Sequence, residues 1–386
     1  SFVTGVDLSQ PKPATRSYDG SKTVARYNDF TKSSLSANSE LDLALDTLRN
    51  RSRGLYRNDP FIRRWVRQVE TNVFGPSGFR FRSRARNLNG GLDTTGNRMV
   101  EDAWALWSKQ CSADGQMSFN EIMRMVGRTW CRDGEIFLEF VVGSRWTHNL
   151  AIRPFEADSI DHTMNKKPTT DGGNFIRQGI EYDQFERPIA YYLLLDHPGE
   201  TYLGSHLNRK HRRIPAERIL HVYLKDRPHQ SRGEPPMAPI MTATKMISGY
   251  REAEVTGRRI AALFNQGSGD IAPIADVETD LGGLEMEVEP GKLTALPAGV
   301  DFEKFDMQTF STDYEQFERQ ILRSISAGLD TAYANLTMDS SNSSYSADRS
   351  DQIKQRDVWK GMQAFFIERC ADKIKERWMR MVFDLR

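Results

Sequence analysis

The chain has 386 residues, which is long enough to bury more than one hydrophobic core, so we expect two or three subdomains. Its 53 lysines and arginines nearly balance its 52 aspartates and glutamates. This near-neutral total excludes a protein that coats nucleic acid through its overall charge.

The N-terminal part combines a polar segment with two predicted helices. Residues 1–39 are rich in Ser, Thr, Asp and Lys and contain no signal-peptide core, which predicts an extended arm. A helix is predicted over 40–56, and residues 58–60, Asn-Asp-Pro, separate it from a second helix that ends at Gly75. Residues 51–91 hold ten arginines against two acidic residues, so this region is strongly basic.

The middle of the chain is predicted to contain most of the strands. Residues 79–86 alternate Phe and Ser with Arg, which is typical of a strand with a basic outer face. A helix with an apolar stripe follows over 99–107, and Ser118 with Glu121 forms a capping box that starts another helix. Further strands are predicted at residues 135–142, 150–155, 175–182, 189–195 and 219–224.

Two long helices and an acidic segment between them organise the C-terminal half. The first helix is predicted over residues 240–264, and the second begins with a capping box at Thr312 and Glu315 and runs to residue 329. Residues 269–318 hold thirteen acidic residues against two lysines. Short strand candidates broken by Pro and Gly predict a small α/β unit, at residues 284–288, 292–296 and 300–305.

The second long helix is predicted to have one packed and one hydrated face. At 100° per residue its apolar side chains gather on one side, and Glu315, Arg319, Arg323 and Ser326 gather on the other. The loop that follows, residues 330–346, has few apolar groups, so we expect it to be mobile. Apolar residues at a 3.6 period then predict one long helix over the rest of the chain.

Motifs for nucleotide phosphate binding, serine hydrolysis and zinc-dependent proteolysis are all missing from the sequence. The glycine-rich residues 265–270 lack the Lys and the preceding strand of a phosphate-binding loop, so they are interpreted as a helix end. The three cysteines are scattered without C-x-x-C spacing, which favours neither a disulfide framework nor a thiolate metal site. We therefore expect no cofactor and no metal. No apolar run approaches the roughly 20 residues needed to cross a bilayer, so we expect no membrane partner.

A few polar residues leave an enzymatic alternative open. Asp158, Asp161 and His162 could offer ligands to a metal, as in a metal-dependent nuclease, although a solvated strand end is the simpler interpretation. His211 and His221 have no nucleophile at a recognisable spacing, so they are interpreted as structural or surface residues.

Arg319 and Arg323 also have two interpretations. They can belong to a solvated helix face, with Glu315 as a salt-bridge partner, or they can be cations that face a phosphate backbone. The residues alone favour the solvated face.

Three stretches carry a family resemblance. The first is RSRGLYRNDP at residues 51–60, followed by NVFG at 72–75. The second is IPAERILH at 214–221, which continues through QSRG at 230–233. The third, SSYSADR at 343–349, is similar to an Asn-Tyr-Ser-Ser-Ala-Arg signature. In this order and spacing they resemble the portal proteins of tailed bacteriophages, specifically the lambda-like portal family.

The resemblance implies an α+β fold with a portal-type architecture and a ring oligomer, usually a dodecamer. The implied parts are an N-terminal arm (1–39), a wing of helices and strands (40–238), a first stem helix (239–264), a small α/β clip (265–311), a second stem helix (312–329), a tunnel loop (330–346) and a long C-terminal helix of the wing that starts the crown (347–386).

The resemblance also implies the function: a non-enzymatic channel at one capsid vertex, for packaging and ejection of double-stranded DNA. It would be assembled in the host cytoplasm and act in the virion. The implied partners are the major capsid protein, the terminase large subunit and head-completion or adaptor proteins. The alternatives are a metal-dependent nuclease and a head or tail structural protein that is not a DNA port.

Two sets of residues are expected to carry that function. The first set would face DNA in the channel and comprises Arg319, Arg323, Asn335, Ser340, Ser341, Asn342, Ser343, Ser344 and Arg349. The second would dock partner proteins at the clip and comprises Glu285, Glu287, Glu289, Asp301 and Glu303.

Overall fold

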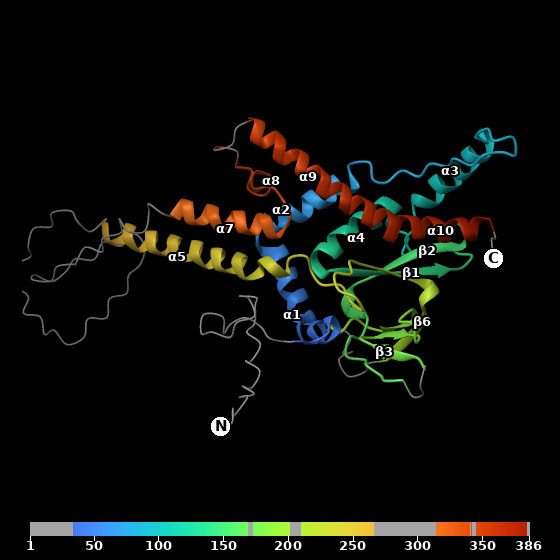
Figure 1. The fold of residues 1–386 in the computed structure, drawn as a ribbon, viewed down its shortest axis with the longest axis horizontal. Coiled ribbons are helices and arrows are strands. Elements are labelled where there is room, and N and C mark those ends of the chain that lie inside the picture. The colour runs from blue at the N-terminus through green and yellow to red at the C-terminus, as the bar shows by residue number, and fades with distance from the viewer. Residues whose placement is uncertain are drawn as a thin grey trace, which may run out of the picture.

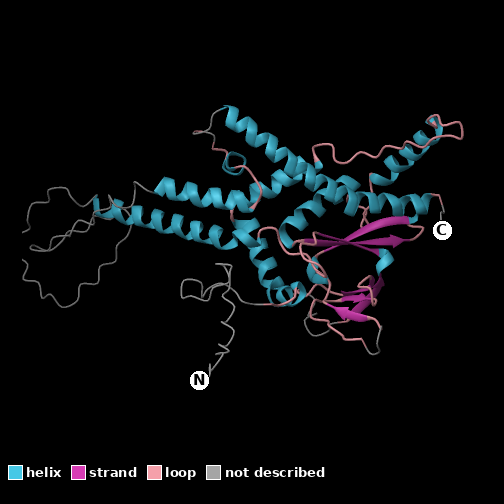
Figure 2. Ribbon diagram, in the orientation of Figure 1, coloured by secondary structure: helices cyan, strands magenta, loops and turns pink. Residues whose placement is uncertain are grey.

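The computed structural model describes residues 34–168, 173–200, 210–265, 314–339, 341 and 345–383. These residues form a body of helices and two small sheets, from which a pair of long helices projects (Figure 1). Figure 2 shows the mixture of helices and strands that the α+β prediction requires. None of the helices within the described ranges is long and apolar enough to cross a bilayer.

The first two helices meet at Asp59. α1 covers Ala37–Asn58 and α2 covers Pro60–Val69, which continues as a π-helical turn over Glu70–Phe74. Asp59 Oδ1 accepts hydrogen bonds from the N–H groups of both Phe61 and Ile62 at 2.9 Å, and Pro60 at the first helical position needs no such partner. These contacts confirm the predicted junction between the two helices. Gly75, at φ 70°, ends the second one as predicted.

The extended segment at residues 79–86 differs from its prediction. Phe79 and Phe81 pack on the core and the arginines of the segment are exposed, as expected, but within the described chain its only β-pairing is an isolated antiparallel bridge between Arg86 and Leu92. The predicted strand is therefore wrong, because an alternating pattern does not itself supply a partner strand. α3 follows at Thr94–Ser108, and its tryptophans are buried while Met99 and Leu106 are exposed.

α4 leads directly into the first strand. It covers Phe119–Asp133 and starts with the predicted capping box, in which Ser118 Oγ accepts from Glu121 N and Glu121 Oε2 accepts from Ser118 N. Gly134 then adopts a left-handed conformation with φ 80°, which ends the helix. A Cβ at Gly134 would lie 2.1 Å from the main chain of Glu234, so a side chain cannot fit there.

Within the described ranges, seven strands form two antiparallel sheets. The first sheet has the order β2-β1-β7, and the second has the order β3-β4-β5-β6. The predicted strand at residues 175–182 is two short strands joined by a turn, and β6 was not predicted. The bounds are β1 Glu135–Val142, β2 Leu150–Phe155, β3 Phe175–Arg177, β4 Ile180–Tyr182, β5 Pro188–Leu194, β6 His211–Pro215 and β7 Ile219–Tyr223.

The remaining helices build the projecting pair and one edge of the body. α5 covers Met241–Asn265 and α7 covers Tyr314–Gly328, close to the predicted bounds. α9, a π-helical turn and α10 form the predicted long C-terminal helix (Figure 1). Their bounds are Tyr345–Phe366, Ile367–Ala371 and Asp372–Val382.

β1 separates two hydrophobic clusters. Ile136, Leu138 and Phe140 face the larger cluster, which the helices cover, and Phe137 faces the smaller one between the two sheets. Because alternate residues of a strand point to opposite faces, a strand that is apolar on both faces has to be buried on both. β1 is consistent with this rule, since its first six residues are buried.

Candidate nucleic-acid interface

α5 and α7 lie side by side and project away from the body (Figure 1). Tyr250 of α5 stacks on Tyr314 of α7 with ring centroids 5.5 Å apart, and it meets Phe317 edge-on at 4.9 Å. Arg251 Nε donates to Glu318 Oε1 at 2.8 Å. Aromatic and charged contacts therefore hold the two helices together, and Arg251 also lies over the Phe61 ring of α2, 4.9 Å from its centroid.

The base of this pair is anchored in the larger hydrophobic cluster. Leu322, Ile325 and Leu329 are buried there, and Trp65 Nε1 donates to the carbonyl oxygen of Leu329 at 3.2 Å. Beyond the base, the described side chains of the pair are not buried. None of the described side chains at residues 248–259 of α5 or 314–321 of α7 is buried.

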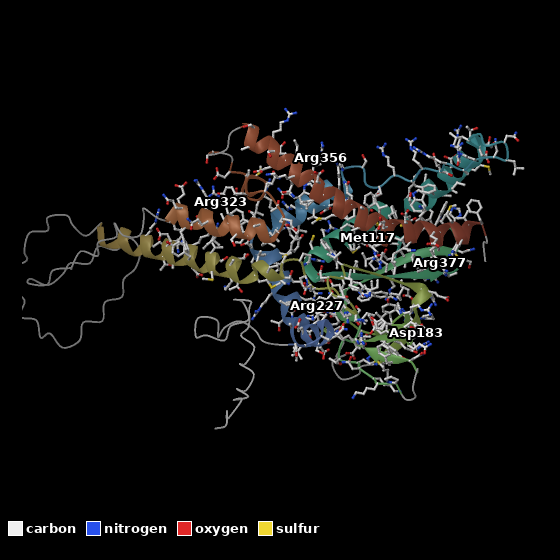
Figure 3. All side chains as sticks on the ribbon, viewed as in Figure 1. Met117, Asp183, Arg227, Arg323, Arg356 and Arg377 are labelled. Atoms are coloured by element: carbon white, nitrogen blue, oxygen red, sulfur yellow. The ribbon has the colours of Figure 1, made fainter. Side chains whose placement is uncertain are left out.

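Arg319 and Arg323 both lie on α7, where Figure 3 labels Arg323. Arg319 Nη2 donates to Glu315 Oε1 at 2.7 Å and lies 3.9 Å from Asp339 Oδ2, so two carboxylates partly neutralise it. The Arg323 guanidinium lies 5.7 Å from the centroid of the Tyr333 ring, in a cation–π contact, and the residue is exposed. Both arginines therefore carry a charge that protein groups already attenuate.

Two residues of α7 depart from their predicted faces. Ser326 was expected on the hydrated face, but it is 3% exposed and its hydroxyl donates to the carbonyl oxygen of Leu322 at 2.7 Å. Phe317 was expected on the packed face but remains exposed. The helix enters the body at its C-terminal end, so burial depends on position along α7 as well as on the face.

The predicted mobile loop at residues 330–346 contains ordered structure, so that prediction is wrong for part of the loop. α8 covers Tyr333–Thr337, and the carbonyl oxygen of Asn335 accepts hydrogen bonds from Arg64 Nε at 2.7 Å and Gln68 Nε2 at 2.5 Å. α9 already begins at Tyr345. The prediction failed because the composition of the loop does not reveal the contacts that α8 makes with α2.

The polar end of this loop is only partly described. Asp339 Oδ1 accepts from Ser341 Oγ at 2.6 Å and from Ser341 N at 3.0 Å, and these hydrogen bonds lower the pKa of Asp339. Arg349 is exposed on the first turn of α9. Ser340, Asn342, Ser343 and Ser344 lie outside the described residues, as do the arm at 1–33 and the predicted clip strands and carboxylates Glu285, Glu287, Glu289, Asp301 and Glu303.

The three candidate nuclease residues bind different partners. Asp158 forms ion pairs with Arg49 and Arg53. Asp161 Oδ2 lies 2.8 Å from His211 Nε2, and His162 Nε2 lies 3.1 Å from Asp46 Oδ2. They do not form the metal-binding group that the nuclease alternative requires.

A different trio does come together. Ligand atoms of Glu156, Asp158 and His197 lie within 4.8 Å of one another. Oxygen and nitrogen donors of this kind can bind a divalent cation. Here, however, Arg53 contacts both carboxylates and supplies a positive charge of its own.

A buried ionic cluster, which the sequence did not reveal, joins α1, β1, β7 and the loop before α5. Glu135 is fully buried, and Arg232 Nε donates to its Oε1 at 2.8 Å. His221 Nε2 lies 2.7 Å from Glu135 Oε2, and the Gly233 N–H donates to the same oxygen at 2.9 Å. Arg49 forms a further ion pair with Glu135. The one available signal was an acidic residue in an otherwise apolar strand pattern.

The cluster fixes the charge states of its members. Burial alone would raise the pKa of Glu135, but Arg232 and Arg49 together hold it well below its usual range. Burial lowers the pKa of His221, which outweighs the opposite effect of Glu135. The His221 ring is also stacked between Phe137 and Tyr223, with centroids 4.1 and 4.2 Å away. His221 is thus a neutral structural side chain at neutral pH.

Comparisons with known proteins found a family model and a relative that match most of this chain. The family model for the phage portal protein, lambda family, matches residues 24–363. A probable portal protein of the Halomonas phage phiHAP-1 is 30% identical over 378 residues, which cover 95% of this chain and 72% of the relative.

Among solved structures, a chain from the neck of an empty GTA particle has 12% identity and a TM-score of 0.44, with 78% of this chain and 75% of that chain covered. A chain from the virion of a native gene transfer agent particle has 11% identity and a TM-score of 0.45, with coverages of 80% and 74%. The family match spans most of the sequence, and the chain therefore belongs to the lambda family of phage portal proteins.

Proposed function

We propose that copies of this chain, twelve in number, close into a ring at one capsid vertex, and that double-stranded DNA passes through its centre during packaging and ejection. α5 and α7 would form the stem that lines the passage. The chain would form the channel, and a separate terminase would drive the DNA through it. The chain itself would catalyse no reaction.

The observation that carries this proposal is the exposure of the projecting helices. Along their outer halves α5 and α7 touch each other, yet no described side chain there is buried. Exposed apolar groups such as Val255 and Phe317 remain on this two-helix arm, whose base is anchored in the larger hydrophobic cluster. Neighbouring copies in a ring would cover the flanks of this arm and leave one side for the passage.

The charge on α7 also suits a conduit. Each phosphate that a protein neutralises strongly adds affinity, and strong binding would oppose sliding. Arg319 is paired with Glu315, and Arg323 lies over the ring of Tyr333. Such cations would attract a duplex weakly and release it again.

The other assignments follow from the same proposal. Residues 330–346, with Asn335, Ser341 and Arg349, would line the narrowest part of the passage, together with Ser340, Asn342, Ser343 and Ser344. Residues 265–311 would form the clip. Their carboxylates, Glu285, Glu287, Glu289, Asp301 and Glu303, would dock the terminase large subunit and later the head-completion proteins. The wing would meet the major capsid protein, with the ring assembled in the host cytoplasm.

A DNA-packaging assay with charge-reversed α7 tests the proposal. We expect Arg319→Glu plus Arg323→Glu to reduce packaged DNA at least about tenfold, because two anions would then face the phosphates. Arg323→Glu alone should have the larger single effect, because Arg319 is 23% exposed and already paired with Glu315.

A matched control distinguishes an effect at the α7 surface from an effect of the changed net charge. Arg63 and Arg67 are exposed on α2, a helix outside the α5–α7 pair, so Arg63→Glu plus Arg67→Glu changes the net charge equally. Its packaging should stay close to wild type. Normal packaging in the α7 double variant, with assembled rings present, would contradict the assignment of these arginines.

A further inference from the structure

A cavity of about 180 Å³ lies between the two sheets, in a part of the body that the proposed function does not use. Its walls come from β4 and β5 of one sheet, from β7 of the other and from the loop after β7. Tyr182, Tyr191 and Ser231 are buried and form its floor, whereas Lys225 and His229 are exposed at its rim. At about 30 Å³ for each water molecule, this volume suits one small ring and is too small for a peptide segment.

The floor carries two polar atoms without a protein partner. Tyr191 is 4% exposed, and its hydroxyl makes no hydrogen bond within the described chain. His221 Nε2 contacts Glu135 Oε2 at 2.7 Å, but His221 Nδ1 has no partner among the same residues. Both atoms keep accessible surface and both residues line the cavity, so both atoms face it. Because buried polar groups are normally hydrogen-bonded, this pair points to a ligand.

The two atoms form one acceptor and one donor. The pKa of Glu135 lies well below its usual range, so the ionised carboxylate accepts the proton of His221 Nε2 and leaves a lone pair on Nδ1. Burial raises the pKa of Tyr191, so its hydroxyl stays protonated and can donate. A complementary ligand offers a donor next to an acceptor. The amino group and the neighbouring ring nitrogen of adenine have this pattern.

The rim adds an unbalanced positive charge. Glu186 is already paired, because it accepts from Arg177 Nη2 at 3.3 Å and lies 2.5 Å from His229 Nδ1. Lys225 lines the same rim and has no ion pair within the part of the chain that the structure describes. An anionic group at the rim would therefore be attracted to Lys225, while an uncharged ring would meet the tyrosines below it.

We infer that this cavity binds a nucleotide whose base carries an amino group. The base would lie among the tyrosine side chains, with its amino group donating to His221 Nδ1 and a ring nitrogen accepting from the Tyr191 hydroxyl. The phosphate would stay at the rim beside Lys225. A free nucleotide and the terminal nucleotide of a DNA strand offer the same chemistry, so the experiment has to distinguish these two sources.

Calorimetric titration of the assembled full chain with adenosine 5′-monophosphate tests this inference. We expect binding to wild type and about tenfold weaker binding to Tyr191→Phe, because one hydrogen bond to the base is lost. The urea unfolding midpoint of this variant should stay close to wild type, since the hydroxyl has no protein partner. Tyr192→Phe is the matched control: the Tyr192 hydroxyl donates to Glu181 Oε2 at 3.1 Å, outside the cavity, and the variant should bind the nucleotide like wild type.

Fragments of the nucleotide separate the two ends of the site. Lys225→Gln should weaken binding of adenosine 5′-monophosphate about threefold and leave binding of adenosine unchanged, because only the nucleotide has a phosphate. Tyr191→Phe should weaken both. The 5′-monophosphate of unsubstituted purine riboside lacks the amino group and should bind about tenfold more weakly than adenosine 5′-monophosphate.

A ten-base single strand of DNA distinguishes the two sources of the nucleotide. Binding that Tyr191→Phe weakens would identify a DNA end, and binding of the free nucleotide alone would identify a small-molecule ligand. Equal binding of adenosine 5′-monophosphate to wild type and Tyr191→Phe would overturn the inference. So would the absence of nucleotide binding up to about 1 mM, which would show that the cavity holds water only. The DNA-packaging assay of the α7 variants is independent of each of these results.

Discussion

Glu135 is a fully buried carboxylate whose partners come from three distant parts of the chain. Arg49 belongs to α1, His221 to β7 and Arg232 to the loop before α5. Such a cluster contributes to stability only while every charge has its counter-charge, since the cost of burying an unpaired charge is large. The sheet, the first helix and the loop that leads to α5 are therefore coupled through one side chain.

Removal of this carboxylate charge should destabilise the protein strongly. In Glu135→Gln the amide keeps the size of the side chain but removes the carboxylate that pairs with the buried Arg232, and it leaves Arg49 with Asp158 alone, 3.5 Å away. We expect the free energy of unfolding to fall by about 3–5 kcal/mol, measured from urea unfolding curves. Glu315→Gln is the matched control: Glu315 is 81% exposed in its pair with Arg319, and the change should be below about 0.5 kcal/mol. A similar loss in both variants would contradict the role of the cluster.

The same cluster predicts a pH dependence. Because burial lowers the pKa of His221, the unfolded chain binds a proton more readily than the folded chain. Stability should therefore fall as the pH drops below about 6.5, the ordinary pKa of histidine. The lowered pKa of Glu135 acts in the same direction at more acidic pH, below about 4.3.

Unfolding curves at pH 7.5 and pH 5.5 test this prediction. In His221→Gln the loss of stability between the two pH values should be smaller than in wild type. His229→Gln, at an exposed histidine that contacts Glu186, should keep the wild-type difference. If His221→Gln loses as much stability as wild type between pH 7.5 and pH 5.5, a group other than His221 is responsible.

At the level of secondary-structure elements, a glycine allows α7 to pack closely against the residue that precedes α5. A Cβ at Gly328 of α7 would lie 2.4 Å from Cγ2 of Ile240, which is buried and β-branched and cannot easily move. We expect Gly328→Ala to destabilise the protein by about 1–3 kcal/mol because the helices must separate at their base.

Gly249 of α5 provides the matched control, because a Cβ there meets nothing within 4 Å. Gly249→Ala should stabilise the protein by up to about 1 kcal/mol through helix propensity. Opposite signs for the two variants in thermal unfolding are the expected result. If Gly328→Ala also stabilises, the tight contact between α7 and Ile240 does not exist.

The sequence predicts elements well where the signal is local. The Asn-Asp-Pro junction at residues 58–60 and the capping box at Ser118 located two helix starts, and Gly75 located one helix end, because each of these signals acts within a single turn. β6 was missed because His211, Arg212 and Arg213 disrupt its apolar pattern, whereas its place in the sheet depends on pairing with β5.

The candidate sites depend on distant contacts, so less of them could be predicted. The pairing of Glu135 with Arg49 and Arg232 spans 86 and 97 positions, and no local pattern encodes it. The carbonyl oxygen of Asn335 binds Arg64 and Gln68 across more than 260 positions. The positions of Arg319 and Arg323 on α7 were predictable from helical spacing. Two of the groups that attenuate their charges, Asp339 and the ring of Tyr333, belong to the segment after α7 and were not predictable in this way.

For the whole molecule, the projecting arm of α5 and α7 is the feature that bears on assembly. A compact body anchors a two-helix arm whose outer half buries no described side chain (Figure 1). Cyclic assembly places the same surface of every copy against the same neighbour, so such arms would form a closed wall around an axis.

Electron microscopy of the purified, assembled protein is the most direct test of the ring and its channel. The account predicts closed rings, of twelve copies, with a central opening wide enough for a DNA duplex and with α5 and α7 of every copy lining it. Particles that remain monomeric, or rings in which α5 and α7 lie away from the central axis, would contradict it.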